Sequence, residues 1–460
     1  MKIRYKNSIL LSAIGDSLGW ITEFEKSSEA IQKKYGVARI EKFYDWEKYV
    51  GGRFNGYLDE IKSGSYSDDT QLLLSVARSI QKNGSIDNLY FSKTELPSWL
   101  NYARGAGRTI KNAAKKIERK SAVWNNNFFT YKVGQTILDY RDSGANGAAM
   151  RILPIALANH RDFGKMKEYI FSNSIVTHGH PRAIVGAILY GYAIDKMLEQ
   201  NLEQFNYKLY LTEIGKDVEQ VFNPKFITKP EFKSWVSIWN IGQDIDFMTV
   251  YEQTVREVLN SLRDVFKFIR DEKSTKDSLQ SFGCFASATK GSGISTVIGG
   301  IYLAIKHYQN PRKAILEAVN SIGADTDSVA AFAGGLIGCL YEIELISDQW
   351  SNVQDRDYLI SISNKLYDIA KKESQEADIP PPFTIGLKSL NEITSDSFFV
   401  NEEIEFIPFG KGVVSSIDRQ KTLTSGKYNL IIDVDFEIGQ SCKFSKILDI
   451  EKNNAQKYFD

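Results

Sequence analysis

Apolar residues recur every three or four positions along most of the chain, as they do in helices that bury one face. Before residue 380, few stretches alternate between apolar and polar residues in the manner of strands. The pattern therefore predicts a mainly α protein, with a large all-α domain over residues 1–375. The segments with helical spacing include Leu72 to Ile80, Ile152 to Ala158, Ile184 to Met197, Val258 to Ile269, Val297 to Ile305 and Tyr358 to Ala370.

The pattern changes after Lys372. Three consecutive prolines, Pro380 to Pro382, favour extended backbone and exclude a helix, so residues 376–397 are predicted to form a linker. Short alternating segments follow, separated by turns that contain glycine. They predict a small β-barrel over residues 398–460. The expected strands are Ile404 to Ile407, Gly412 to Ile417, Tyr428 to Phe436, Ser441 to Phe444 and Ile447 to Ile450.

An acidic segment, Gly323 to Ser328, runs directly into the smooth apolar stretch Val329 to Gly338. Its two carboxylates, Asp325 and Asp327, stand where a helix begins. Alone, they are explained by a helix cap. Crowded oxygen donors without His or Cys also suit Mg²⁺ or Ca²⁺ and argue against zinc.

A second acidic segment, Ser67 to Thr70, also precedes an apolar run of helical spacing. It contains Asp68 and Asp69. If the fold brings the two segments together, their carboxylates repel one another unless a counter-ion is present. A pair of divalent cations at the starts of two helices resolves this repulsion.

Small residues follow the first acidic segment. Gly334 and Gly338 lie four apart, with Ala330 on the same face. Such a face lets another backbone approach closely, which predicts that this helix is buried against a partner.

Three polar segments contain glycine or histidine at positions of interest. Gly15 to Glu23 is predicted to be a flexible turn that presents Glu23. Ser143 to Arg151 is either a tight turn at a helix start or a loop whose backbone N–H groups hold a diphosphate. His178 and His180 lie two apart, which favours a surface turn, and at least one of them is expected to do more.

Composition limits the class of protein. Lys+Arg and Asp+Glu both number 57, which removes any bulk electrostatic argument for binding nucleic acid or membrane. The three cysteines form no C-x-x-C pattern, so a reducing cytoplasm is the expected location. The basic start and the short apolar stretch Ile9 to Gly15 are read as a first helix. The longer apolar runs fall short of the roughly 20 residues of a membrane span, so a soluble protein is expected.

Five segments, in this order, resemble the ADP-ribosylglycohydrolase family, which includes the dinitrogenase-reductase-activating glycohydrolase and the arginine- and serine-specific ADP-ribosyl hydrolases. The resemblance covers most of the first domain and implies an all-α fold with two Mg²⁺ (or Mn²⁺) ions. It also implies a hydrolase that releases ADP-ribose from a modified protein, with arginine linkage favoured. The segments are Gly15 to Glu23, Ser67 to Thr70, Gly144 to Pro154, Thr177 to Pro181 and Gly323 to Gly338.

The resemblance also implies a role for individual residues. Serines at positions 67 and 328 replace the threonines of many family members and keep the hydroxyl group. The implied metal ligands are Ser67, Asp68, Asp69, Asp325, Asp327 and Ser328. The implied catalytic residues are Glu23, Asp68 and Asp327, and the implied contacts to the diphosphate and ribose are Gly144, Asn146, Gly147 and His178.

Several alternatives stay open at this point. The domain could be a catalytically inactive ADP-ribose-binding adaptor or a metal-dependent phosphohydrolase of nucleotides; the intact acidic segments and Glu23 favour the glycohydrolase. An ADP-ribosylated nucleic acid or small molecule is an alternative substrate. Residues 202–282 match nothing recognisable, and the sequence does not give the oligomeric state.

The last segment resembles a different module. Phe409 to Val414, Leu430 to Phe436 and Ile447 to Glu451 are similar to the SH3- or Tudor-like module of UvrD/PcrA-type repair helicases, which contacts RNA polymerase. The resemblance implies a protein partner, with RNA polymerase as a candidate and a generic interaction barrel as the alternative. We expect recruitment of the target; the competing hypothesis is that the barrel packs over the metal cleft.

Overall fold

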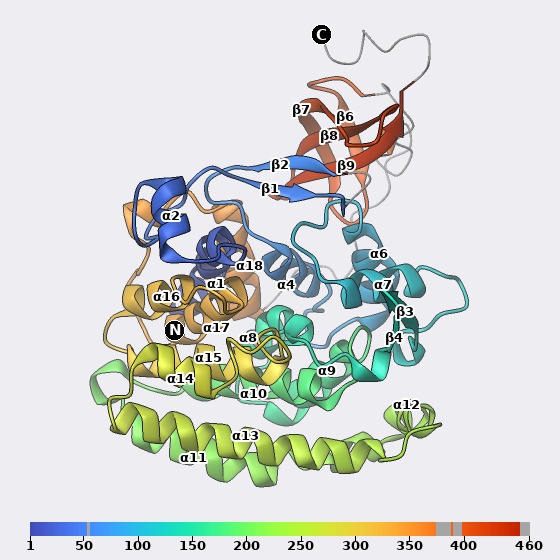
Figure 1. The fold of residues 1–460 in the computed structure, drawn as a ribbon. Helices are drawn as coiled ribbons and strands as arrows, with labels where there is room; N and C mark the ends of the chain where they lie inside the picture. Colours follow the sequence, from blue (N-terminus) through green and yellow to red (C-terminus); the bar gives the residue numbers. More distant parts are fainter. Residues whose placement is uncertain (53–55, 374–387, 390–397, 451–460) are drawn as a thin grey trace.

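The computed structural model describes residues 1–52, 56–373, 388–389 and 398–450. Helices form the body of the protein, and the C-terminal strands stand at one side of it (Figure 1). The mainly helical fold predicted from the sequence is confirmed. Most of the predicted linker, including its prolines, lies outside the described residues. None of the described helices is both long and apolar enough to cross a bilayer.

The helices fall on either side of residue 200 in the sequence; η labels mark 3-10 helices, except η1, which is a π-helix. The first group is α1 (Lys2–Thr22), α2 (Ser28–Tyr35), α4 (Asp68–Arg78), α5 (Asn88–Tyr90), η1 (Phe91–Glu95), α6 (Leu96–Trp99), α7 (Arg108–Ile117), η2 (Trp124–Asn126), η3 (Tyr140–Asp142), η4 (Asn146–Arg151), α8 (Leu153–Ala158), α9 (Phe163–Ser174) and α10 (Pro181–Leu198). The second group is η5 (Leu202–Gln204), α11 (Tyr207–Val221), η6 (Pro224–Thr228), α12 (Pro230–Asn240), α13 (Phe247–Arg270), α14 (Thr275–Ser281), α15 (Gly293–Lys306), α16 (Pro311–Val319), α17 (Thr326–Gly338), η7 (Asp348–Trp350) and α18 (Arg356–Ala370).

Helix α17 is buried and packs closely on α1. A Cβ atom added to Gly334 would lie 2.2 Å from the carbonyl oxygen of Leu11, and one added to Gly338 would lie 2.6 Å from backbone atoms of Asn7. The close backbone approach predicted for this small-residue face is therefore confirmed.

The segment from Gly15 to Glu23 is not a flexible turn. Helix α1 continues through Thr22, so the prediction of a loop here was wrong. Gly15 and Gly19 are small because α17 crosses them. A Cβ on Gly15 would meet the carbonyl oxygen of Ala330 at 2.4 Å. Glycine in this helix allows close packing rather than a turn.

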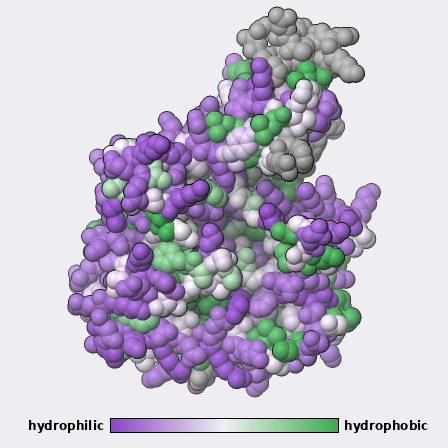
Figure 2. Space-filling model, viewed as in Figure 1, coloured by the Kyte–Doolittle hydropathy of each residue, from purple (hydrophilic) through white to green (hydrophobic). Residues whose placement is uncertain are grey.

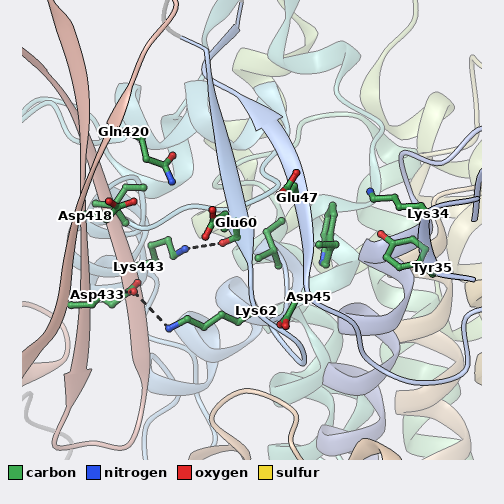
Figure 3. Close-up of a pocket in the computed structure, with 14 residues that line it drawn as sticks. Lys34, Tyr35, Asp45, Glu47, Glu60, Lys62, Asp418, Gln420, Asp433 and Lys443 are labelled. Atoms are coloured by element: carbon green, nitrogen blue, oxygen red, sulfur yellow. Dashed lines mark hydrogen bonds and ion pairs between the residues drawn. The ribbon is translucent and has the colours of Figure 1, made fainter. Parts of the chain in front are cut away.

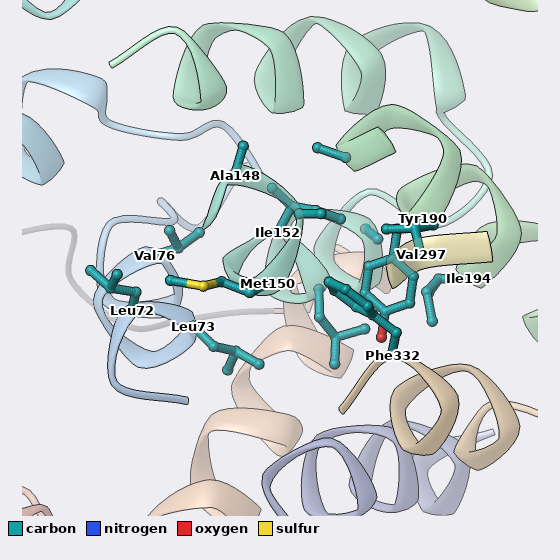
Figure 4. Close-up of a cluster of buried hydrophobic side chains, with 14 of the residues drawn as sticks. Leu72, Leu73, Val76, Ala148, Met150, Ile152, Tyr190, Ile194, Val297 and Phe332 are labelled. Carbon is teal, nitrogen blue, oxygen red and sulfur yellow. The ribbon is translucent and has the colours of Figure 1, made fainter. Parts of the chain in front are cut away.

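The largest apolar core lies between α4, η4, α10, α15 and α17 (Figure 4). Met150 reaches toward Leu73 on α4, while Tyr190 and Phe332 meet edge to face with ring centroids 4.8 Å apart. Burying each such side chain contributes about 1.5–3 kcal/mol. This core holds α4 and α17, the two helices that follow the acidic segments, in fixed positions.

The helical body also contains two β-hairpins, so it is not wholly α. Strands β1 (Trp46–Val50) and β2 (Tyr57–Ile61) pair antiparallel, as do β3 (Thr130–Val133) and β4 (Thr136–Asp139). The β1–β2 hairpin lies between the helices and the C-terminal strands (Figure 1).

The unmatched residues 202–282 form α11 to α14 and their connections. Helix α13 buries an apolar stripe that includes Phe247, Val258 and Val265, and it contacts α10 and α15. Figure 1 places α11 and α13 at the bottom of the molecule, away from the β1–β2 hairpin.

The C-terminal strands form one sheet in the order β5-β6-β7-β8-β9, antiparallel except for the short parallel pair β5–β6. The strands occur where the alternation predicted them, but the last two predicted strands are one continuous strand, β9. Closure into an SH3- or Tudor-like barrel stays a prediction. The strands are β5 (Lys388–Ser389), β6 (Glu403–Phe406), β7 (Gly410–Lys421), β8 (Lys427–Phe436) and β9 (Ser441–Asp449).

The C-terminal sheet packs against the helical body. The buried ring of Tyr102 contacts Phe409 and Phe444 at centroid distances of 5.1 and 5.9 Å. Arg78 on α4 donates a hydrogen bond to Gln440 Oε1 at 2.6 Å. On the hairpin side, Lys443 Nζ donates to the carbonyl oxygen of Glu60 at 2.8 Å (Figure 3). The outer face of the molecule is mostly hydrophilic, with apolar residues in scattered patches (Figure 2).

Candidate functional site

The start of α4 is fixed by a buried carboxylate on α1. Asp16 accepts hydrogen bonds from the backbone N–H of Ser67 at 3.1 Å and of Thr70 at 3.0 Å, and from Thr70 Oγ1 at 2.6 Å. Ser67 is the N-cap, and its Oγ accepts from the N–H of Asp69 at 3.2 Å. These contacts orient Asp68 and Asp69 in the first helical turn, where the helix dipole favours negative charge.

The start of α17 meets the start of α4. Ser328 Oγ donates a hydrogen bond to Asp69 Oδ2 at 2.7 Å. Asp325 is the N-cap of α17, and Asp327 lies in its first turn. Asn146 Nδ2 donates to Asp325 Oδ2 at 3.0 Å. The fold therefore brings the two acidic segments into one cluster, together with the predicted substrate contact Asn146.

Glu23 lies at the C-terminal end of α1, beside this cluster. Burial and the nearby charge of Asp325 raise the pKa of Glu23 to about 8. Burial and the charge of Asp16 raise the pKa of Asp68 to about 7, and burial raises the pKa of Asp69 and Asp327 well above the usual range. Carboxylates this close and this buried favour protonation or a bound cation.

Two lysines face the cluster from outside. Lys48 on β1 interacts electrostatically with Glu23, Asp327 and Asp68, and burial lowers its pKa. Lys111 on α7 interacts with Asp68, and burial lowers its pKa as well. These are the cations named among the causes of the shifts of Glu23 and Asp68, apart from the more distant Lys290 beside Glu23.

The chemistry of the donors fits divalent cations. The cluster offers carboxylate and hydroxyl oxygens from the starts of two helices, and the raised pKa values of its acids indicate excess negative charge. Within the described ranges, however, no three His, Cys, Asp or Glu side chains are already arranged around one ion position. The Ser328–Asp69 hydrogen bond uses two of the oxygens that would have to turn toward a cation.

The remaining predicted substrate residues lie beside Asn146. A Cβ added to Gly147 would lie 2.8 Å from the ring of His178, so these two residues are in direct contact. His178 is buried, its Nδ1 is 2.8 Å from Thr177 Oγ1, and burial lowers its pKa to about 3. His178 is therefore neutral at physiological pH and sits in the interior rather than on the surface turn that is the default for such a pair. Arg151, also buried, donates to the carbonyl oxygen of Gly147 at 2.7 Å.

Gly144 lines a pocket of about 440 Å³ together with His180 and residues 287–292. The glycine segment around it is not an open loop. Asn146 N–H donates to the carbonyl oxygen of Gly291 at 2.9 Å, and Gly293 N–H donates to that of Gly144 at 3.0 Å. Residues 146–151 form η4. Backbone pairing thus uses part of the N–H set that the sequence predicted for a diphosphate.

The order and position of these motifs agree with a family comparison. The family model described as ADP-ribosylglycohydrolase matches residues 2–376. The chain belongs to the ADP-ribosylglycohydrolase family. The match ends before the C-terminal sheet, which is therefore an addition to the family domain.

Individual relatives are distant. The chain is 28% identical over 188 residues to the ADP-ribosyl-[dinitrogen reductase] glycohydrolase of Rhodospirillum rubrum, a match that covers 40% of this chain and only 55% of that protein. It is 23% identical over 375 residues to ADP-ribosylhydrolase ARH3 of Danio rerio, covering 80% of this chain and 91% of the relative. It is 21% identical over 377 residues to ADP-ribosylarginine hydrolase Tri1 of Serratia proteamaculans (strain 568), covering 80% of each.

Sequence reasoning missed two features of this glycohydrolase site. Asp16 was read only as the end of an apolar run, yet it organises α4. Gly105, with a φ of +86°, lies against Asp68: an added Cβ would be 2.9 Å from Asp68 Oδ1. The available indication was the segment Arg104-Gly105-Ala106-Gly107 just before α7, where closely spaced glycines contain no acid or hydroxyl to draw notice.

Proposed function

We propose that this ADP-ribosylglycohydrolase is a metal-dependent hydrolase that removes mono-ADP-ribose from a modified protein, with arginine as the favoured linkage. One observation carries the proposal: the Ser328–Asp69 hydrogen bond joins the starts of α17 and α4 into a single acidic cluster. Family membership supplies the reaction class.

The cluster would hold two Mg²⁺ (or Mn²⁺) ions. Bound cations supply the positive charge that lets a water molecule lose its proton near neutral pH. Asp16 and Asn146 act as positioning residues, because they hydrogen-bond the start of α4 and the carboxylate of Asp325. The ligands in this proposal are Ser67, Asp68, Asp69, Asp325, Asp327 and Ser328.

Glu23 would move the proton. Hydrolysis breaks the bond from the ribose C1 to the target side chain and forms a bond from C1 to the water oxygen, while a proton passes to the leaving group. Glu23 is partly exposed, whereas Asp68 and Asp327 are buried. Its pKa of about 8 lets it carry a proton near neutral pH. Asp68 and Asp327 complete the catalytic set, since both interact electrostatically with Glu23.

The ADP-ribose would lie on the side of η4. Gly144, Asn146, Gly147 and His178 would contact its diphosphate and ribose, and contacts remote from the reacting bond position the substrate. His178 serves as a neutral hydrogen-bonding group in this role, because its lowered pKa removes it as an acid. The three cysteines are unpaired and buried, which suits work in a reducing cytoplasm.

Arginine linkage is favoured on two grounds. The acidic cluster attracts a guanidinium group, and one relative is named an ADP-ribosylarginine hydrolase. We propose further that the C-terminal sheet contacts a protein, RNA polymerase being a candidate from the resemblance of its strands.

Product analysis tests the function. Peptides that carry ADP-ribosyl-arginine or ADP-ribosyl-serine are incubated with the protein and Mg²⁺, and products are identified by mass spectrometry. We expect intact ADP-ribose, faster from arginine, and a loss of about 10²–10⁴-fold in Glu23→Gln. Glu29→Gln, at an exposed position on α2, is the matched control.

Other outcomes contradict the proposal in distinct ways. Faster release from serine overturns the linkage. Release of a mononucleotide or phosphate indicates a phosphohydrolase. Binding of ADP-ribose without turnover of any substrate indicates the inactive adaptor.

A further inference from the structure

A second pocket borders the acidic cluster on the side of the C-terminal sheet. It has a volume of about 420 Å³ and is enclosed by the β1–β2 hairpin, the segment before α7, and strands β8 and β9. Gly105 and Trp20 form its inner end. Because Gly105 also lies against Asp68 Oδ1, this inner end is next to the cluster.

Cations dominate the lining of this pocket. One acid, Asp59, is among its lining residues, and it is paired with Arg104 at 2.9 Å and approached by Lys443 at 3.8 Å. The lysines come from three parts of the chain: Lys48 from the hairpin, Lys111 from α7, and Lys443 and Lys446 from β9. Once cations occupy the cluster, the pull of its acids on Lys48 and Lys111 is weakened, and the pocket favours an anion.

The C-terminal sheet also contributes a buried donor to this pocket. Asn429 on β8 is 1% exposed, lines the pocket, and its Nδ2 has no hydrogen-bond partner. An unpaired buried N–H group costs free energy, which an acceptor oxygen on a ligand would recover. In the β8–β9 ladder, Asn429 is opposite Ile447 and Ile431 is opposite Ser445, and all four residues line the pocket.

A neighbouring pocket has the opposite character. It has a volume of about 730 Å³ and lies between the hairpin and the sheet near Lys443, which lines both pockets (Figure 3). Its lining includes the acids Asp45, Glu47, Glu60, Asp418 and Asp433 against three lysines. The cationic character is therefore specific to the pocket that borders the cluster.

We propose that the C-terminal sheet completes a subsite for the protein target, and that this subsite binds acidic residues that flank the ADP-ribosylated side chain. The inference rests on the proposed function, in which ADP-ribose occupies the opposite side, by η4. The target segment then leaves the cluster through the pocket between the hairpin and β8–β9. The sheet acts in substrate selection rather than only as a separate recruiting module.

Peptide selectivity tests the subsite. Three ADP-ribosyl-arginine peptides are compared, with acidic, neutral or basic residues on both sides of the modified arginine, and kcat/KM is measured at low and high salt. Two or three partly exposed charge pairs give about a tenfold preference for the acidic over the neutral peptide. The preference should shrink in 0.5 M salt, where the screening length is only a few Å.

Charge reversal assigns the preference to the sheet. Lys446→Glu, at an exposed position, should abolish or invert the ratio of acidic to neutral kcat/KM. Lys411→Glu, on exposed β7 and outside both pockets, should leave the ratio unchanged.

The two proposals fail separately. If no peptide is cleaved, the proposed function is wrong. If all three peptides are cleaved at equal rates, or if Lys446→Glu keeps the wild-type ratio, the subsite is refuted while the function stands. A stronger preference for an ADP-ribosylated oligonucleotide than for the acidic peptide also overturns the choice of an acidic protein segment.

Discussion

Replacing Gly19 with alanine should disturb both the fold and the acidic cluster. Gly19 lies near the end of α1, where the first turn of α17 crosses it. An added Cβ would lie 2.4 Å from Asp327 Cα and from the carbonyl oxygen of Thr326, and 2.5 Å from the backbone nitrogen of Asp327. All three contacts are backbone atoms, so no side chain can turn away to relieve them.

The size of the effect follows from these contacts. Ordinary van der Waals contact begins at 3.4 Å, so the two helices must separate by about 1 Å. Overpacking of this kind costs up to about 3 kcal/mol, and the better helix propensity of alanine returns about 0.5–1 kcal/mol. We expect a net loss of about 2 kcal/mol in the free energy of unfolding. A shift of about 1 Å at Asp327 should also reduce activity about 100-fold.

Urea unfolding followed by circular dichroism measures the first effect, and release of ADP-ribose at saturating Mg²⁺ measures the second. Gly215→Ala is the matched control: Gly215 is also helical, on α11, and a Cβ there meets nothing within 4 Å. The control should gain about 0.5–1 kcal/mol and keep full activity. If Gly19→Ala matches the wild type in both assays, the close crossing of α1 and α17 does not set the geometry of the site.

Three further predictions concern named groups. Asp68→Asn and Asp327→Asn should each abolish hydrolysis and lower Mg²⁺ affinity in calorimetry while circular dichroism stays unchanged; full activity after chelation and Mg²⁺ re-addition would contradict the metal assignment. Arg78→Met should cost about 3–5 kcal/mol because it leaves the buried Glu95 carboxylate unpaired, and Arg78→Met with Glu95→Leu should recover most of that loss in urea unfolding. His178 has a pKa of about 3 when folded against 6.5 in the unfolded chain, so the unfolded state takes up the proton first as pH falls. Between pH 6.5 and 3 the wild type should therefore lose up to about 1.4 kcal/mol per pH unit more than His178→Asn, and equal slopes in urea unfolding would refute this.

The helices were predictable because their apolar faces repeat locally. The β1–β2 hairpin was not. Its inner residues, such as Lys48 and Asp59, face groups on α7 and β9 that are far away in sequence, so no local apolar face marks the strands. Gly15 and Gly19 were misread for a related reason: a glycine that permits a turn and one that permits a helix crossing look alike until the partner is known.

The members of the acidic cluster were predictable because hydroxyls and acids recur at two helix starts. Their support was not: Asp16 lies inside an apolar helix, and its partners, Ser67 and Thr70, are about fifty residues away. Likewise, the alternation of β8 and β9 predicts strands but does not reveal that Asn429 faces the catalytic domain.

The pairing of α1 with α17 has a consequence for synthesis on the ribosome. Thr22 and Thr326, whose hydroxyls are 3.1 Å apart in the folded protein, are separated by 304 residues. At about 5–20 residues per second, the first helix waits roughly 15–60 s before its partner is translated. During that interval the apolar residues around Gly15 and Gly19 have no native cover. A nascent chain stalled before residue 338 should therefore bind a chaperone that recognises exposed apolar helices, and it should release that chaperone once α17 has left the ribosome.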